Sequence, residues 1–251
     1  MKISNTELKT TKMRIAAVAD LHTRLTDKGK LGDYFRDISK QADILLIGGD
    51  LTDTGDEVEA QVLAEELKNC NIPVVAVLGN HDHEKGRHKL IRNTIENENI
   101  HILDGESVVV GKIGIAGIKG FGGGFDNHML SMFGEDAMKE FVKEAVNEAL
   151  NLERALNRLD QDNENIQKLV LMHYAPFTST VIGEPEQIYP FLGCSRLAEP
   201  LSRFNIYAVF HGHAHKGIFT AETSTGLKIY NVSKSVLSKM GYSPPVIFLE
   251  V

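Results

Sequence analysis

The chain has 251 residues, of which 42% are hydrophobic and 24% charged, a balance typical of a globular protein. Its formal net charge of −7 argues against tight, sequence-independent binding of nucleic acid, which needs many Lys and Arg on the phosphates. The two cysteines, Cys70 and Cys194, are too few for a disulfide-rich secreted scaffold. Residues 1–13 lack the apolar segment of a signal peptide, and no apolar run approaches the ~20 residues of a membrane span. We therefore expect a soluble, cytoplasmic protein.

The first half of the chain alternates apolar runs with helical patterns. The runs predict strands that are buried on both faces, and they lie at 14–19, 44–47 and 74–78. The intervening segments 57–69 and 88–98 predict helices. This alternation indicates a layered α/β protein with sheet in the middle and helices outside, and we expect one domain over residues 1–251.

The second half of the chain predicts more strands than helices. Its apolar runs lie at 108–110, 113–118, 169–172, 207–210, 227–231 and 246–251. Apart from 169–172 and 207–210, these runs follow one another with little helix between them. They therefore predict a second, more antiparallel sheet.

A glycine-rich stretch and a helical pattern interrupt these strands. Residues 120–124 read Gly-Phe-Gly-Gly-Gly, and apolar residues recur at spacings of three or four over 135–159. One interpretation is a helical cap or insertion at about 121–166, hinged at the glycines. The alternative is a core-packed helix behind an ordinary loop. The helix 135–159 could also be the surface through which the chain forms a homo-oligomer.

Five of the predicted strands end in residues of the types that bind metals. In chain order these residues are Asp20 and His22; Asp50 and Asp53; Asn80, His81 and Asp82; His173; and His211, His213 and His215. Ligands of α/β sheets bind beyond the carboxyl ends of the strands, so these side chains are expected to share one site. Each motif alone is weak, but together they predict a metal centre. Their carboxylate, amide and imidazole groups suit Mn, Fe or Zn, and the absence of a cysteine ligand argues against a structural zinc site.

The order Asp-x-His, Gly-Asp-x-x-Asp, Gly-Asn-His-Asp, His, Gly-His-x-His resembles the calcineurin-like metallophosphoesterase superfamily, over about residues 13–215. The resemblance implies a four-layer α/β/β/α sandwich with two mixed sheets and two divalent metal ions. It implies that Asp20, His22, Asp50 and His215 hold one ion. It implies that Asp50, Asn80, His173 and His213 hold the other, with Asp50 bridging. His81 matches the catalytic histidine, and Asp53 matches the acid that orients it.

These assignments fit a known chemistry of phosphate esters. Two adjacent divalent ions clamp the phosphoryl group and generate a hydroxide between them. His81 is then the candidate proton donor to the departing oxygen. Other residues that could contact substrate are Arg24, His83, Arg87 and His128. We expect His88 and His101 to be structural, and His211 to be satisfied within its strand.

The substrate class is a separate question. Protein phosphatases of this superfamily continue the second motif as Asp-Arg-Gly, whereas Asp53 is followed here by Thr54 and Gly55. The motifs are more similar to those of bacterial small-molecule members, which favours a small phosphodiester or phosphomonoester over nucleic acid. The alternatives are a nuclease on the same core and a non-catalytic binding scaffold.

Overall fold

The computed structural model describes residues 12–162 and 166–251. The N-terminal residues 1–11, where a signal peptide was sought in the sequence, lie outside the described residues. Residues 163–165, near the end of the expected insertion, also lie outside them.

The first sheet has five strands in the order β11-β1-β2-β3-β4. Their bounds are β1 Arg14–Val18, β2 Ile44–Gly48, β3 Val74–Val77, β4 Ile100–Leu103 and β11 Ile247–Glu250. Strands β1 to β4 are parallel, and β11 is antiparallel to β1. The prediction that 246–251 joins the second sheet is therefore wrong. The apolar run predicts a strand but does not predict which strand it pairs with. In the structure it pairs with β1, from the other end of the chain, with Ile15 opposite Leu249.

The second sheet has six strands in the order β5-β6-β7-β8-β10-β9. Their bounds are β5 Glu106–Val110, β6 Ile113–Ile118, β7 Gln167–Met172, β8 Ala208–His211, β9 Thr220–Glu222 and β10 Lys228–Asn231. Strands β6, β7, β8 and β10 are parallel, and only the edge strands β5 and β9 pair antiparallel. This sheet is mixed rather than mainly antiparallel, because helical connections bring β7 and β8 beside β6 in the same direction.

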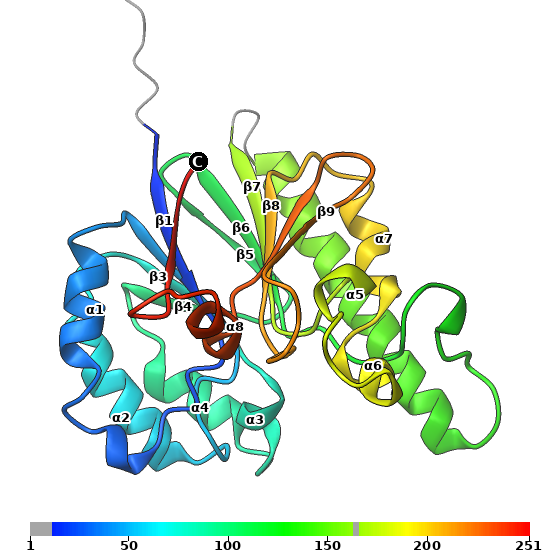
Figure 1. The fold of residues 1–251 in the computed structure, drawn as a ribbon, viewed down its shortest axis with the longest axis horizontal. Coiled ribbons are helices and arrows are strands. Elements are labelled where there is room, and N and C mark those ends of the chain that lie inside the picture. Colours follow the sequence, from blue (N-terminus) through cyan, green and yellow to red (C-terminus); the bar gives the residue numbers. More distant parts are fainter. Residues whose placement is uncertain (1–11, 163–165) are drawn as a thin grey trace, which may run out of the picture.

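The two sheets pack face to face between two layers of helices, which is the four-layer α/β/β/α sandwich (Figure 1). The first sheet is covered by α1 Gly32–Ser39, α2 Glu57–Leu67 and α4 His88–Ile95, and the second by α5 Asp136–Asp162 and α7 Ala198–Leu201. Three further helices are α3 Asn80–His83, α6 Tyr189–Leu192 and α8 Lys234–Lys239. Single 3-10 turns lie at Leu25–Asp27, Asp126–His128, Thr178–Thr180, Glu186–Ile188 and Ser195–Leu197.

Helix α5 corresponds to the helical pattern at 135–159. Its residues Ala145, Leu152 and Leu156 are buried in one core cluster with Ile118 and Val170 of the second sheet. Most of α5 is therefore an outer layer of the sandwich, whereas its first turn is exposed and projects from the fold (Figure 1). No helix among the described residues is long and apolar enough to cross a membrane.

Candidate metal centre

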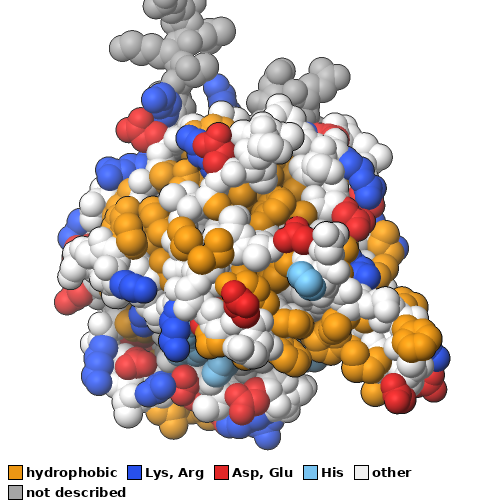
Figure 2. Space-filling view, turned by 45° about the vertical axis from the view of Figure 1, so that its right-hand side comes forward, with side chains coloured by type: hydrophobic (Ala, Val, Ile, Leu, Met, Phe, Trp, Pro, Cys, Tyr) orange, Lys and Arg blue, Asp and Glu red, His pale blue; other side chains and the backbone are white. Residues whose placement is uncertain are grey.

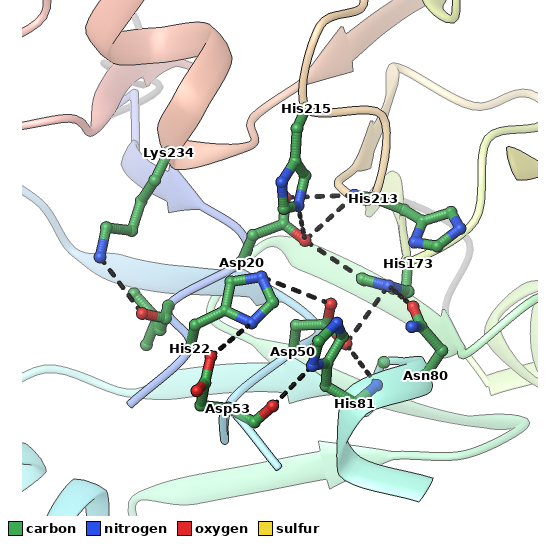
Figure 3. Close-up of polar contacts among 12 residues, drawn as sticks. Asp20, His22, Asp50, Asp53, Asn80, His81, His173, His213, His215 and Lys234 are labelled. Atoms are coloured by element: carbon green, nitrogen blue, oxygen red, sulfur yellow. Dashed lines mark hydrogen bonds and ion pairs between the residues drawn. The ribbon is translucent and has the colours of Figure 1, made fainter. Parts of the chain in front are cut away.

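The carboxyl ends of five strands bring the predicted ligands together. Asp20 and His22 follow β1, Asp50 follows β2, Asn80 opens α3 after β3, His173 follows β7, and His213 and His215 follow β8 (Figure 3). One group of possible ligands is Asp20, His22, Asp50 and His215, and another is Asp50, His173 and His213. Within each group the ligand atoms lie within 4.8 Å of one another. Asp50 belongs to both groups.

The two oxygens of the buried Asp50 carboxylate face different histidines. Oδ1 lies 3.4 Å from His173 Nε2, and Oδ2 lies 3.7 Å from His22 Nε2. Oδ1 also accepts a hydrogen bond of 2.9 Å from the backbone N–H of His81, which fixes the orientation of the carboxylate. Asp50 can therefore offer one oxygen to each ligand group.

Asn80 completes the second group through a contact with His173. The Nδ1–H of His173 donates to the carbonyl of Gly48 at 2.9 Å, so Nε2 carries the lone pair. That nitrogen lies 2.8 Å from the amide Oδ1 of Asn80. Two acceptors at this distance repel each other, and a cation bound by both would remove the repulsion. The pair fits a metal site.

The remaining histidines also present free lone pairs. Both ring nitrogens of His22 are buried and have no hydrogen-bond partner among the described residues. Buried polar atoms are almost always paired, so the one lone pair of this neutral ring fits a bound cation. The Nε2–H of His213 donates to the carbonyl of Phe191 at 3.0 Å, which leaves Nδ1 for coordination. The side chains present therefore fit a site that could hold a metal ion.

The backbone is strained at the same positions. Five non-glycine residues among those described have a positive φ, and four of them are Asp20 (59°), His22 (46°), Asp50 (49°) and His213 (67°). Each such residue costs of order 1–3 kcal/mol, and such strain clusters at functional sites. The fifth, Asp126, lies elsewhere.

Close approach of the backbone explains two of the glycines in the motifs. A Cβ at Gly79 would lie 2.1 Å from Asp50 Oδ1, and a Cβ at Gly49 would lie 2.4 Å from His173 Nδ1. Gly49 also has a φ of +88°, which glycine adopts most readily. At both positions, any larger residue would displace a possible ligand.

Burial controls the protonation of the site in the absence of metal. Burial, with the charges of Asp20 and Asp82, raises the pKa of Asp50 to about 9. Burial opposes ionisation of Asp20, but His215, whose Nε2 lies 3.5 Å from Oδ1, and the nearby His173 hold its pKa below the usual value. Burial lowers the pKa of His22 to about 4 and that of His173 well below its usual value. These two imidazoles are therefore neutral and able to coordinate at neutral pH.

His81 lies next to the cluster of possible ligands, and its ring centroid is 4.5 Å from that of His22. Its Nδ1–H donates to the main-chain oxygen of Asp53 at 2.6 Å, which leaves Nε2 free. The Asp53 carboxylate, which we expected to orient His81, makes no hydrogen bond with this ring, although one of its oxygens lies within 4.8 Å of a His81 ring nitrogen. That carboxylate accepts from Arg24 at 2.9 and 3.2 Å and lies 3.6 Å from Nδ1 of His22. It is engaged in these contacts because Arg24 follows the first motif and reaches across to the second.

The structure does not bring His83, Arg87 or His128 into the ligand groups of the described residues. The His83 ring stacks on His88 at 4.2 Å, and Arg87 pairs with Glu57 of α2. Burial and the charge of Lys119 lower the pKa of His83 to about 4.

The other histidines and the remaining candidate lie outside the cluster. His128 is exposed and lines a separate cavity of 360 Å³ with Glu186 and Tyr189. His101 lies half-buried in β4. The buried His211 bonds through Nε2 to Thr180 and through Nδ1 to the carbonyl of Gly212, at 2.8 and 2.9 Å, so both of its nitrogens are satisfied.

Two residues of the site carry roles that the sequence reasoning missed. Asp82 is fully buried and accepts four hydrogen bonds, from Leu51 N, Thr52 N, Thr52 Oγ1 and Gly79 N. It thereby ties the second motif to the third. Lys234 opens α8 beside Asp20 and donates to the carbonyl of Leu21 at 3.2 Å (Figure 3). The Gly-Asn-His-Asp motif could have signalled Asp82, but no sequence pattern marks Lys234.

A family model described as calcineurin-like phosphoesterase matches residues 13–217, and the chain belongs to this family. It is accordingly a metal-dependent phosphoesterase, a hydrolase that acts on phosphate esters. The Asp and His groups at the strand ends are the part of the chain that could bind the metal.

Solved structures share this fold at low sequence identity. The phosphopantetheinyl hydrolase of Mycobacterium tuberculosis is 13% identical, with a TM-score of 0.64 over 95% of this chain and 96% of that chain. The protein TT1561 of Thermus thermophilus is 16% identical, with a TM-score of 0.60 over 90% of this chain and 92% of that chain. No curated protein matches this chain. The likenesses establish the fold and leave the substrate to be inferred from the site.

Proposed function

We propose that the protein hydrolyses small phosphate esters at two divalent cations that share Asp50. Asp20, His22 and His215 complete one ligand set, and Asn80, His173 and His213 complete the other. The observation that carries the proposal is the placement of the Asp50 carboxylate, with Oδ1 toward His173 and Oδ2 toward His22.

The protonation of Asp50 supports the binding of a cation at this site. A proton on Asp50, whose pKa is raised to about 9, is the alternative to a cation there. When bound, two such cations polarise the phosphoryl oxygens and make water acidic enough to act as a nucleophile near neutral pH. The protein supplies the neutral imidazoles and buried carboxylates that favour cation over proton.

His81 is the residue we assign to proton transfer at the departing oxygen. Its Nδ1–H is held by the Asp53 carbonyl, so the free Nε2 can carry a proton toward the ester. The backbone N–H of His81 binds Asp50, which couples its position to the ligand set.

We assign the Asp53 carboxylate to orienting His22 and Arg24, whereas the motif predicts that it orients His81. Its carboxylate lies 3.6 Å from Nδ1 of His22, where it favours the tautomer with a proton on Nδ1 and a lone pair on Nε2. Its bond to Arg24 holds that guanidinium at the edge of the site, where a planar fork can receive a phosphate oxygen.

The proposal is tested with Mn-loaded protein and a panel of phosphomonoesters, phosphodiesters and plasmid or single-stranded DNA. We expect metal-dependent hydrolysis of at least one small ester. Cleavage confined to DNA would favour a nuclease, and bound metal without any hydrolysis would favour a binding scaffold. Asp50→Asn is expected to lose both metal and activity.

A further inference from the structure

An aromatic wall stands beside the metal centre on the side of His213. We define it as Tyr174, Phe121, Phe141 and Phe191. These residues come from the loop after β7, the glycine-rich stretch, α5 and α6. The centroid distances along the wall are 4.4 Å from His213 to Tyr174, 5.8 Å to Phe121, 4.8 Å to Phe141 and 6.3 Å to Phe191. The rings thus form one continuous row of contacts that begins at the proposed metal ligand His213.

The wall also ends at the same ligand. The main-chain oxygen of Phe191 accepts the 3.0 Å hydrogen bond from Nε2 of His213, so the backbone of Phe191 lies beside this ligand while its ring contacts Phe141. The backbone N–H of Gly123 donates to Pro190 O at 2.6 Å, which fixes the glycine-rich stretch against α6. These main-chain bonds make the wall a built part of the site rather than a chance grouping of loops.

The outer part of the wall is open to solvent, whereas Tyr174 is buried next to His213. Phe191 is 60% exposed, and Phe121 and Phe141 are half-buried. Figure 2 shows hydrophobic side chains running from the middle of this face to the lobe at its right-hand side. Exposed aromatic residues next to a polar centre are a common mark of a ligand surface.

We propose that this wall is the subsite for the organic group of the ester, and that the group is an aryl ring or a similarly flat apolar group. The inference rests on the proposed function, because the phosphate must sit at the metal centre for its substituent to reach the wall. Phe rings prefer edge or offset contact with other flat rings. A compact alkyl ester such as a methyl group would leave the wall unused.

The test compares two anions that differ only in this group, phenylphosphonate and methylphosphonate, by titration calorimetry on Mn-loaded protein. We expect phenylphosphonate to bind about tenfold more tightly. Phe191→Ala and Phe141→Ala should each remove most of that preference and leave methylphosphonate affinity within about twofold. Phe141→Ala is informative even if Phe191→Ala disturbs α6, because the Phe141 backbone lies in a long helix. Phe133→Ala, at an 82% exposed phenylalanine outside the wall, is the matched control and should keep the preference.

The outcomes separate the two proposals. Equal affinity of the wild type for both phosphonates would contradict the proposed aryl subsite but not the proposed metal centre. A preference for phenylphosphonate that persists in both wall variants would do the same. Binding of neither phosphonate would contradict the proposed function and the wall together.

Discussion

Replacing Gly79 with alanine tests whether the third motif is shaped around Asp50. The φ of Gly79 is −113°, so alanine meets no backbone strain there and the effect is one of space alone. The new Cβ would lie 2.1 Å from Asp50 Oδ1 and 2.4 Å from Asp50 N. Ordinary contact begins at 3.4 Å, so the carboxylate must move by about 1.3 Å and the backbone N of Asp50 by about 1.0 Å.

A displacement of this size falls on the carboxylate that the proposal shares between both cations. Misplacement by about 1 Å can cost of order 100-fold in rate, so we expect kcat/KM to fall at least that far. Bound metal should fall with it, measured by elemental analysis of protein dialysed against Mn²⁺. Steady-state kinetics on an ester hydrolysed by the wild type gives the rate.

Gly86→Ala is the control for this prediction. Gly86 has a φ of +65° but nothing within 4 Å of its would-be Cβ, so the variant carries strain without a clash. We expect it to lose about 1 kcal/mol of stability and to keep its metal and rate. Gly79→Ala with wild-type metal content and kcat/KM would refute the reasoning, because Asp50 would then tolerate displacement.

Three further variants and conditions test separate parts of the site. His81→Asn should lower kcat about 100-fold while metal content stays near the wild-type value; unchanged turnover would remove His81 from proton transfer. Asp82→Asn should lower the free energy of unfolding by about 3 kcal/mol in denaturant titration, because an amide cannot accept from all four donors. Mn²⁺ affinity should rise at least about tenfold per pH unit from about pH 6 to 8. Below about pH 9 the cation must displace the proton of Asp50, whose pKa is raised, and rising pH removes that competition. His22 and His173 are neutral over this range and add no further dependence. The nearby Asp20 raises the pKa of His215, so this ligand must also lose a proton and makes the dependence steeper toward pH 6. A flat affinity in calorimetry would contradict the raised pKa.

The convergence of the candidate ligands was predictable because each one directly follows an apolar run of the sequence. Parallel strands place their carboxyl ends at one edge, so Asp20, Asp50 and Asn80 had to meet once the strands were recognised. The fold class followed from the same alternation of strands and helices.

Pairings between distant segments were not predictable in this way. Strand β11 has the apolar pattern of any strand, and only the tertiary packing places it against β1. Helix α1 buries just Phe35 and Ile38, too few apolar positions to mark it in the sequence. His81 contacts the main-chain oxygen of Asp53, because the Asp53 carboxylate is bonded to Arg24. No sequence motif indicates this position of Arg24.

The central claim is tested most directly by anomalous diffraction from crystals of the Mn-loaded protein. The account predicts two manganese peaks about 3.5–4 Å apart on either side of the Asp50 carboxylate. One peak should lie among Asp20, His22 and His215, and the other among Asn80, His173 and His213. A single peak, or peaks away from these side chains, would contradict the account.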